Sequence, residues 1–378
     1  MKTATTILVF CVASLLALGM VMLYSSSMAD KGTHYLFMQL IWCSAGLVTC
    51  GAAAALDYKL LKKFAWPLFG LAVAMLVLVL IPHIGFKVNG ARRWFKVGGS
   101  GIRFQPSELG KLALIVAVAW YGDRYQRQMG TWKRGILFPA IFIGLILGLI
   151  FVEPDRGTTI LMAAVSGMML LIAGVRLRCT IPPILAGIAA LGVSLMHDTM
   201  RMNRIFSWMH QEDTKEGVGY QANHAMMALG AGGWTGLGLG NSREKLGFLP
   251  EHNTDFIFSI IGEELGLVAT LLVVLTFIFL VCSGLYISYR ASDTFGLLLG
   301  SGITSLIGLQ AVINIGVVTS ALPNKGLPLP FISYGGSNLL MMLTCVGLLL
   351  SIARRARVPA ASADASLEPE GMPSPQMS

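Results

Sequence analysis

Long apolar stretches alternate with shorter polar loops along most of this chain. A membrane-spanning helix needs about 20 apolar residues, and about ten stretches have a suitable length. They cover residues 6–26, 35–56, 64–82, 106–122, 136–152, 158–174, 180–197, 255–284, 295–318 and 332–353. The pattern predicts an all-α, polytopic integral membrane protein whose transmembrane domain occupies residues 1–353.

The polar segments between these stretches differ in length. Glu153-Pro154-Asp155-Arg156-Gly157 separates the fifth and sixth stretches and is a tight hairpin, because proline and glycine interrupt helices. The two longest loops are residues 83–105 and 198–254. Residues 354–378 are rich in Pro, Ser and Ala and predict a disordered cytoplasmic tail.

Composition supports a membrane protein. Hydrophobic residues make up 55% of the chain and charged residues only 12%, whereas soluble domains carry about 25% charged residues. The net charge of +9 does not indicate nucleic-acid binding, because the basic residues are scattered over short loops. Membrane lipid is the expected surrounding, and no nucleic-acid partner is expected.

The distribution of Lys and Arg predicts the orientation. Short cytoplasmic loops are enriched in these residues, and the short loops on the side of the two termini carry most of them. Both termini are therefore expected in the cytoplasm, with loop 198–254 outside. The basic loop 83–105 would also lie outside and needs a functional reason to do so.

Asp255 lies where the 198–254 loop enters the eighth stretch. An ionisable group at such a place is costly and predicts function. A structural alternative is that Asp255 caps the helix or lies in its first turn, although Thr254 could cap equally well. Glu263 and Glu264 lie about two turns further in, and we expect them to be buried and paired with Arg or Lys from other spans.

Other polar clusters fall near the same predicted face. Arg92 and Arg93 stand beside two aromatic residues, which suits an anionic headgroup or an interfacial belt. Glu108 and Lys111 are three residues apart on one helix face, which suits an ion pair or a binding role. The 153–157 hairpin is either solvated or part of a binding site.

A proline-rich segment, residues 321–337, comes late in the chain. Its three prolines prevent a regular helix, and non-helical backbone at membrane depth is tolerated only where it lines a cavity or is buried in protein. The segment is therefore a plausible wall of a substrate groove.

Five motifs occur together in one order, and the chain resembles the SEDS (shape, elongation, division and sporulation) family over residues 5–355. The motifs are Gly90-Ala91-Arg92-Arg93-Trp94, Gln105-Pro106-Ser107-Glu108-Leu109-x-Lys111, Glu153-Pro154-Asp155-x-Gly157-Thr158, Pro250-Glu251-x-x-Thr254-Asp255-Phe256-Ile257-Phe258 with Glu263-Glu264, and Gly326-x-Pro328-Leu329-Pro330-Phe331-x-Ser333-Tyr334-Gly335-Gly336-Ser337. Residues 314–330 resemble the division and sporulation branch more than the elongation branch. Asn253, Arg156 and Asn338 depart from the usual pattern, which leaves the geometry of the neighbouring loops open.

The resemblance implies a ten-span glycosyltransferase of the bacterial cytoplasmic membrane. Such an enzyme polymerises lipid II into peptidoglycan glycan strands at the outer membrane face during septal wall synthesis. It would act with a class B penicillin-binding protein, a transpeptidase, and with other division proteins. The resemblance also implies that Asp255, the aspartate of the Thr254-Asp255-Phe256 motif, is the catalytic residue.

Seven polar residues in or beside the motifs are expected to bind substrate: Arg92, Arg93, Glu108, Lys111, Arg156, Lys325 and Ser333. Four of them would neutralise the lipid diphosphate, directly or with a divalent cation such as Mg²⁺ or Mn²⁺, although no cofactor is certain: Arg92, Arg93, Lys111 and Arg156. Three alternatives stay open, namely an elongation-type polymerase, a lipid II flippase and a non-catalytic scaffold for the transpeptidase.

Overall fold

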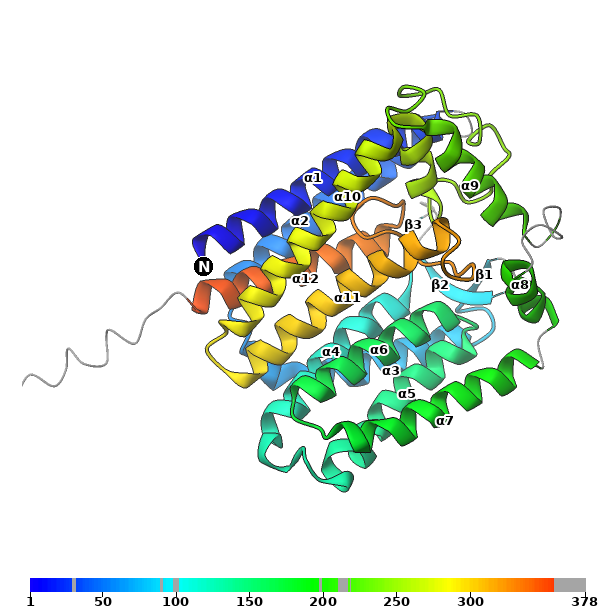
Figure 1. Ribbon diagram of the computed structural model, residues 1–378. Coiled ribbons are helices and arrows are strands. Elements are labelled where there is room, and N and C mark those ends of the chain that lie inside the picture. The colour runs from blue at the N-terminus through cyan, green and yellow to red at the C-terminus, as the bar shows by residue number, and fades with distance from the viewer. Residues whose placement is uncertain are drawn as a thin grey trace, which may run out of the picture.

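The computed structural model describes residues 1–28, 32–88, 91–97, 102–196, 199–209, 217 and 219–356. Within these residues, helices occupy all ten predicted stretches (Figure 1). They are α1 (Lys2–Ser27), α2 (His34–Ala55), α3 (Leu60–Leu80), α4 (Pro106–Arg124), α5 (Phe138–Val152), α6 (Arg156–Ile172), α7 (Leu177–Met196), α10 (Ile257–Tyr289), α11 (Thr294–Val318) and α12 (Gly336–Arg355). The all-α, polytopic fold is confirmed.

Seven helices in the described part of the chain are long and apolar enough to cross a membrane: α1, α2, α3, α5 with its preceding turn (Lys133–Val152), α10, α11 and α12. Helix α6 is a shorter apolar helix. Helix α4 carries charged residues near both ends, and neighbouring helices bury most of its side chains. It therefore meets protein more than lipid.

Helix α11 joins the two halves of the bundle. It packs against α10 and α12 on one side and against α4 and α6 on the other. On the side of α10 and α12, α12 packs on α2 and α1 packs on α10. On the side of α4 and α6, α3 packs on α4. The strands and helices of the long loops lie at one end of the bundle, and the N-terminus lies at the opposite end (Figure 1).

Helix α10 is interrupted at Gly266, whose φ of 76° lies in the left-handed region that favours glycine. A β-carbon here would lie 2.5 Å from the carbonyl oxygen of Trp234. Loop amides bind carbonyls next to the break, with Leu237 N donating to Glu263 O at 2.9 Å and Gly238 N donating to Glu264 O at 3.0 Å. The glycine-rich segment 230–240 thus packs its backbone closely against α10.

Loop 83–105 contains a small sheet that the all-α expectation missed. Strands β1 (Phe86–Val88), β2 (Ala91–Val97) and β3 (Ile102–Phe104) pair antiparallel in the order β1-β2-β3. The signal was present, since alternating apolar and basic residues flank Asn89-Gly90, a typical hairpin turn. The strands have only three, seven and three residues, so they leave no apolar stretch of membrane-spanning length.

The 198–254 loop contains helices α8 (Thr199–Met209) and α9 (Tyr220–Gly232). At the other end of the chain, α12 continues to Arg355, slightly beyond the predicted boundary of the transmembrane domain. The predicted disorder of residues 357–378 lies outside the described residues.

Candidate active site

Asp255 lies in a turn just before α10, which begins at Ile257 with Phe256 as its N-cap. The structural alternative for Asp255, a cap or first-turn residue, is therefore wrong. Thr254 is not the cap either, because Phe256 is the N-cap and no side chain accepts a capping hydrogen bond there. The Thr254 hydroxyl donates to the Glu251 carboxylate at 3.0 Å. The Asp255 side chain is partly exposed and is not used to begin the helix.

The proline-rich segment lies directly against this turn. A β-carbon on Gly326 would lie 2.8 Å from Oδ2 of Asp255, so the backbone of the proline-rich segment passes close to this carboxylate. The Ser333 hydroxyl donates to Thr254 O, and Tyr334 N donates to Asn253 O at 2.9 Å. Residues 326–334 thus form one side of the Asp255 environment.

The surroundings of Asp255 favour its protonated form. Burial, followed by the Glu251 and Asp155 carboxylates, raises the pKa of Asp255 to about 7, while Arg93 acts in the opposite direction. A carboxylate with a pKa near neutrality can accept a proton from a hydroxyl group and later release it.

Arg93 joins loop 83–105 to the 153–157 hairpin. Its Nε donates to Glu153 O at 2.7 Å, and its Nη2 donates to Pro154 O at 2.6 Å. Asp155 caps α6 by accepting from Thr158 N at 3.1 Å. The Nε and Nη2 donors of Arg93 therefore both bind the backbone of the hairpin.

Arg92 has a different position. Together with Lys87 it lines a cavity of about 260 Å³ that is also bordered by Glu153 and Pro154. The two cations make this cavity suitable for an anionic group. The sequence analysis named Arg92 but not Lys87. Lys87 pairs with Arg92 across the β1–β2 hairpin, so a predicted hairpin at this place would have indicated it.

Glu153 is fully buried, and its carboxyl oxygens have no hydrogen-bond partner among the described residues. Burial and the nearby Asp155 raise the pKa of Glu153 to about 8, against a lowering effect of Arg93. Sequence reasoning considered the hairpin as a unit and did not single out this residue.

Glu108 and Lys111 form the ion pair that their spacing predicts, with 2.8 Å between Oε2 and Nζ. Both side chains are buried. Asn338 of α12 donates to Glu108 at 3.2 Å, and Lys111 donates to Gln310 of α11 at 3.3 Å. The pair joins three helices, and its expected substrate contact stays a prediction.

The remaining predicted substrate residues lie around the same end of the bundle. Arg156 begins α6, with its guanidinium 5.2 Å from the Phe151 ring centroid. Lys325 is partly buried, and burial lowers its pKa. The buried Ser333 hydroxyl binds backbone on both sides, accepting from Leu329 N and donating to Thr254 O. Substrate contacts by these residues stay predictions.

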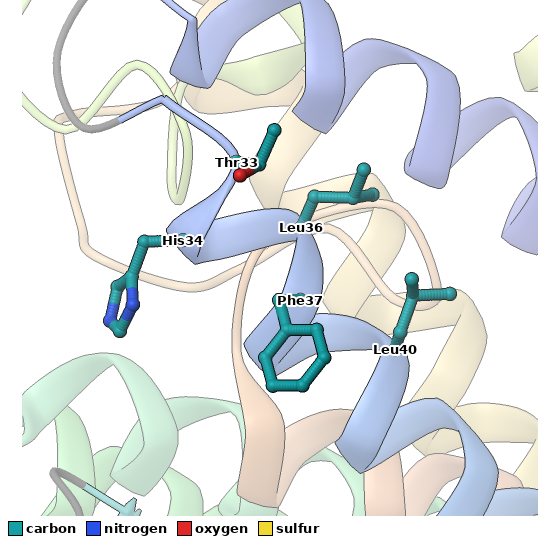
Figure 2. Close-up of a pocket in the computed structure, with 5 residues that line it drawn as sticks. All are labelled: Thr33, His34, Leu36, Phe37 and Leu40. Carbon is teal, nitrogen blue, oxygen red and sulfur yellow. The ribbon is translucent and has the colours of Figure 1, made fainter.

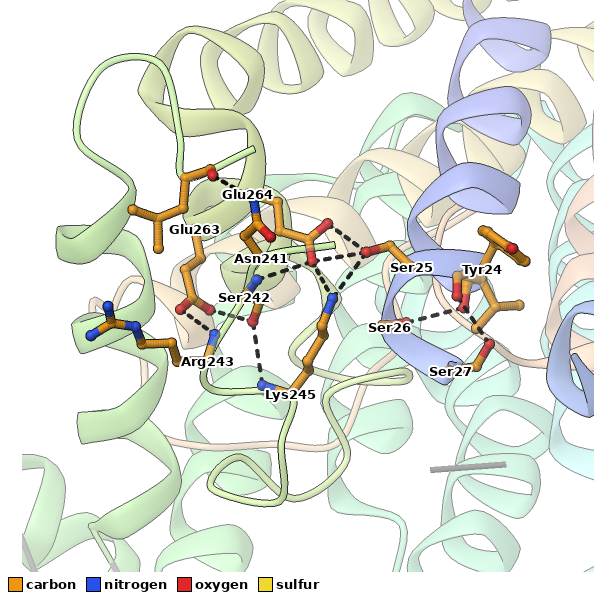
Figure 3. Close-up of polar contacts among 12 residues, drawn as sticks. Tyr24, Ser25, Ser26, Ser27, Asn241, Ser242, Arg243, Lys245, Glu263 and Glu264 are labelled. Atoms are coloured by element: carbon orange, nitrogen blue, oxygen red, sulfur yellow. Dashed lines mark hydrogen bonds and ion pairs between the residues drawn. The ribbon is translucent and has the colours of Figure 1, made fainter. Parts of the chain in front are cut away.

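Glu263 and Glu264 are buried as expected, but their partners differ from the expected ones (Figure 3). Glu264 binds Lys245 Nζ at 2.8 Å and also accepts from the Ser25 hydroxyl of α1. Glu263 accepts from Ser242 and from Arg243 N. The cation comes from the preceding loop and not from another span, because this loop folds back over the break in α10.

A second hollow, of about 480 Å³, lies at the start of α2 and is lined by Thr33, His34, Leu36, Phe37 and Leu40 (Figure 2). Its lining is mainly apolar and contains no carboxylate, so we place the chemistry at Asp255. Among the described residues, no three His, Cys, Asp or Glu side chains are arranged to hold a metal ion. The divalent cation of the sequence analysis stays an untested expectation.

A bundle of long apolar helices defines a multi-pass membrane protein, and the Asp255 carboxylate lies at one end of this bundle. The model of the cell cycle protein family that covers FtsW, RodA and SpoVE matches residues 5–358, and the chain belongs to this family. The match confirms the SEDS resemblance.

Individual relatives cover nearly the whole chain. A "Probable peptidoglycan glycosyltransferase FtsW" of Trichlorobacter lovleyi is 40% identical over 352 residues, which are 92% of each chain. "Stage V sporulation protein E" of Bacillus subtilis is 36% identical over 358 residues, covering 93% of this chain and 97% of that protein. These relatives agree with the expected division and sporulation branch.

A solved structure described as "Structural coordination of polymerization and crosslinking by a peptidoglycan synthase complex" has a similar fold. Its TM-score is 0.78 at 27% sequence identity, and the match covers 93% of this chain and 97% of that chain. The fold described above is thus that of a protein found in such a complex.

Proposed function

We propose that this chain is a peptidoglycan glycosyltransferase that polymerises lipid II at the outer face of the cytoplasmic membrane during septal wall synthesis. The observation that carries the proposal is the position of Asp255, a carboxylate with a pKa of about 7 beside a proline-rich wall. Family membership and the names of the relatives support the reaction class.

The chemistry follows from the residues around Asp255. A sugar hydroxyl of one lipid-linked saccharide attacks the anomeric carbon of another, and Asp255 accepts the hydroxyl proton. A carbon–oxygen bond forms between the two sugars, and the bond from the anomeric carbon to the diphosphate oxygen breaks. The lipid diphosphate leaves with the electron pair of that bond.

Arg92 and Lys87 are the cations best placed to offset the charge of the leaving diphosphate, because both line the cavity beside the hairpin. Arg93 is better explained as the residue that holds the hairpin, since two backbone carbonyls occupy its guanidinium. This assignment gives the basic loop 83–105 the functional reason it needs to lie outside.

The proposal includes a partner and an orientation. The similar synthase complex, which coordinates polymerization with crosslinking, supports a class B penicillin-binding protein as partner. Both termini would lie in the cytoplasm and Asp255 outside, which matches the distribution of Lys and Arg in the short loops.

The test uses purified protein with lipid II, in the presence and absence of the penicillin-binding partner. We expect Asp255→Asn and Asp255→Ala to lower the polymerisation rate by about 10²- to 10⁴-fold, the usual contribution of a general base. The wild-type rate should rise with pH through about 7, because the base acts in its ionised form. Long glycan made by either variant at the wild-type rate would rule out Asp255 as the base.

A further inference from the structure

Two amide side chains of α11 hold the proline-rich segment. Gln310 Nε2 donates to Pro328 O at 2.8 Å, and Asn314 Nδ2 donates to Leu327 O at 2.7 Å. The two residues are four apart and therefore share one helix face. They bind two consecutive carbonyls of this segment. Its prolines have no backbone N–H groups, so the segment cannot form a regular series of backbone hydrogen bonds by itself.

Asn314 also binds the backbone of the candidate base. Its Nδ2 donates to Asp255 O at 2.8 Å, so one amide group bridges Asp255 and Leu327. Asn314 is 1% exposed, and its Oδ1 has no hydrogen-bond partner among the described residues. The two carbonyl acceptors determine the orientation of the amide, since only the NH₂ group can donate to both.

The Asn314 bridge sets the distance between Asp255 and the proline-rich segment beside it. Leu327 follows Gly326, the residue whose backbone faces Oδ2 of Asp255. By holding the carbonyls of residues 255 and 327 on one nitrogen, Asn314 fixes both sides of the Asp255 environment. A displacement of about 1 Å in a reacting group can cost a hundredfold in rate.

We propose that Asn314 is a positioning residue for Asp255, which acts by holding the Asp255 turn and the proline-rich segment together from α11. The inference rests on the proposed function in one respect, namely that Asp255 is the base. The contact itself does not depend on the reaction.

The bridge is also the end of a longer polar path. Lys111 donates to Gln310, which holds the carbonyl next to the one that Asn314 holds. The buried Glu108–Lys111 pair thus contacts the back of the wall through Gln310.

The test compares Asn314→Leu and Asn314→Asp with wild-type protein, all full-length and assayed with lipid II and the penicillin-binding partner. Leu keeps the approximate size without any donor, and Asp can donate at most one hydrogen bond. We expect kcat to fall about ten- to hundredfold with KM little changed, because the lost alignment matters in the transition state. The acid limb of the pH–rate profile should move to lower pH, because a released Asp255 carboxylate gains water.

Asn324→Leu is the matched control. It makes the same chemical change, but the Asn324 amide donates to Gln221 of α9 at 2.8 Å and not to the Asp255 turn. We expect wild-type kcat and an unchanged pH profile for this variant. Thermal unfolding of each variant separates loss of rate from loss of fold.

Hydrogen–deuterium exchange of residues 250–256 and 325–330 gives a readout that does not need activity. Asn314→Leu should raise exchange in both segments, whereas Asn324→Leu should leave residues 250–256 unchanged. If exchange rises but wild-type protein makes no glycan, the contact stands and the proposed function fails. Unchanged exchange, a wild-type kcat, or failure of both Asn314 variants to fold would overturn the positioning role.

Discussion

The residues near the hairpin show how burial changes the chemistry of a carboxyl group. Burial is the main cause in both cases, and it raises the pKa of Asp255 to about 7 and the pKa of Glu153 to about 8. At neutral pH, Glu153 is therefore mainly protonated. Its neutral form avoids the cost of an unpaired buried charge.

Glu153 provides a test of this burial at the scale of one residue. Its folded-state pKa of about 8 exceeds the ordinary value of 4.5, so the folded protein keeps a proton that the unfolded chain loses. The stabilisation is present below pH 4.5 and is lost as pH rises toward 8. Glu153→Gln cannot ionise, so its free energy of unfolding at pH 8 should exceed that of the wild type by about 1–3 kcal/mol.

Thermal unfolding at a pH below 5 and at pH 8 checks this expectation, since the advantage of Glu153→Gln should shrink at the lower pH. Lower stability of Glu153→Gln than of the wild type at pH 8 would show that the ionised carboxylate is stabilised by a partner.

The first turns of α10 depend on the loop before them. The helix is interrupted at Gly266, and the segment that follows Asp255 is held by contacts from outside the helix. Ser25 of α1 and Lys245 of the loop both bind Glu264, while Ser242 binds Glu263 (Figure 3). These buried contacts attach the α10 start to α1 and to the loop.

Removing one member of the Lys245–Glu264 pair should damage this attachment. Lys245→Met leaves a buried carboxylate without its cation, which typically costs about 3–5 kcal/mol. The double variant Lys245→Met/Glu264→Leu removes both charges and should recover most of that loss. Thermal unfolding of the single and double variants measures the difference, and equal stability of wild type and Lys245→Met would contradict a stabilising role for the pair.

At the scale of the whole molecule, the two long loops lie at one end of the helix bundle (Figure 1). The sheet, α8 and α9 lie at the end of the bundle where Asp255 precedes α10, and the N-terminus lies at the other end (Figure 1). Under the proposed orientation, the Asp255 end faces away from the cytoplasm.

Cysteine labelling tests this orientation. Leu246 and Tyr289 are both exposed and lie on opposite sides of the α10 span. In cells with a permeabilised outer membrane, an impermeant maleimide should label Leu246→Cys, and it should label Tyr289→Cys only after lysis. The unsubstituted protein, which has six native cysteines, is the control. The reverse pattern would invert the proposed topology.

Much of the site could be predicted because its motifs are local. The spacing of Glu108 and Lys111 predicted their ion pair, and the position of Asp255 beside an apolar stretch predicted a costly carboxylate. The partners of Arg93 and Glu264 could not be predicted, because they are selected by contacts between segments far apart in the chain. Asn314 had no signal of its own, since an amide within an apolar helix does not indicate which carbonyls it will meet.

The sequence by itself determined the membrane class, the helix positions and the family, because hydropathy and ordered motifs are properties of consecutive residues. The tertiary structure decided which motifs meet. It brought Gly326 to Asp255 and the hairpin to Arg93. It also brought two α11 amides to backbone carbonyls of the proline-rich segment. Buried polar groups must find partners wherever packing provides them, so these contacts exist only once the helices are assembled.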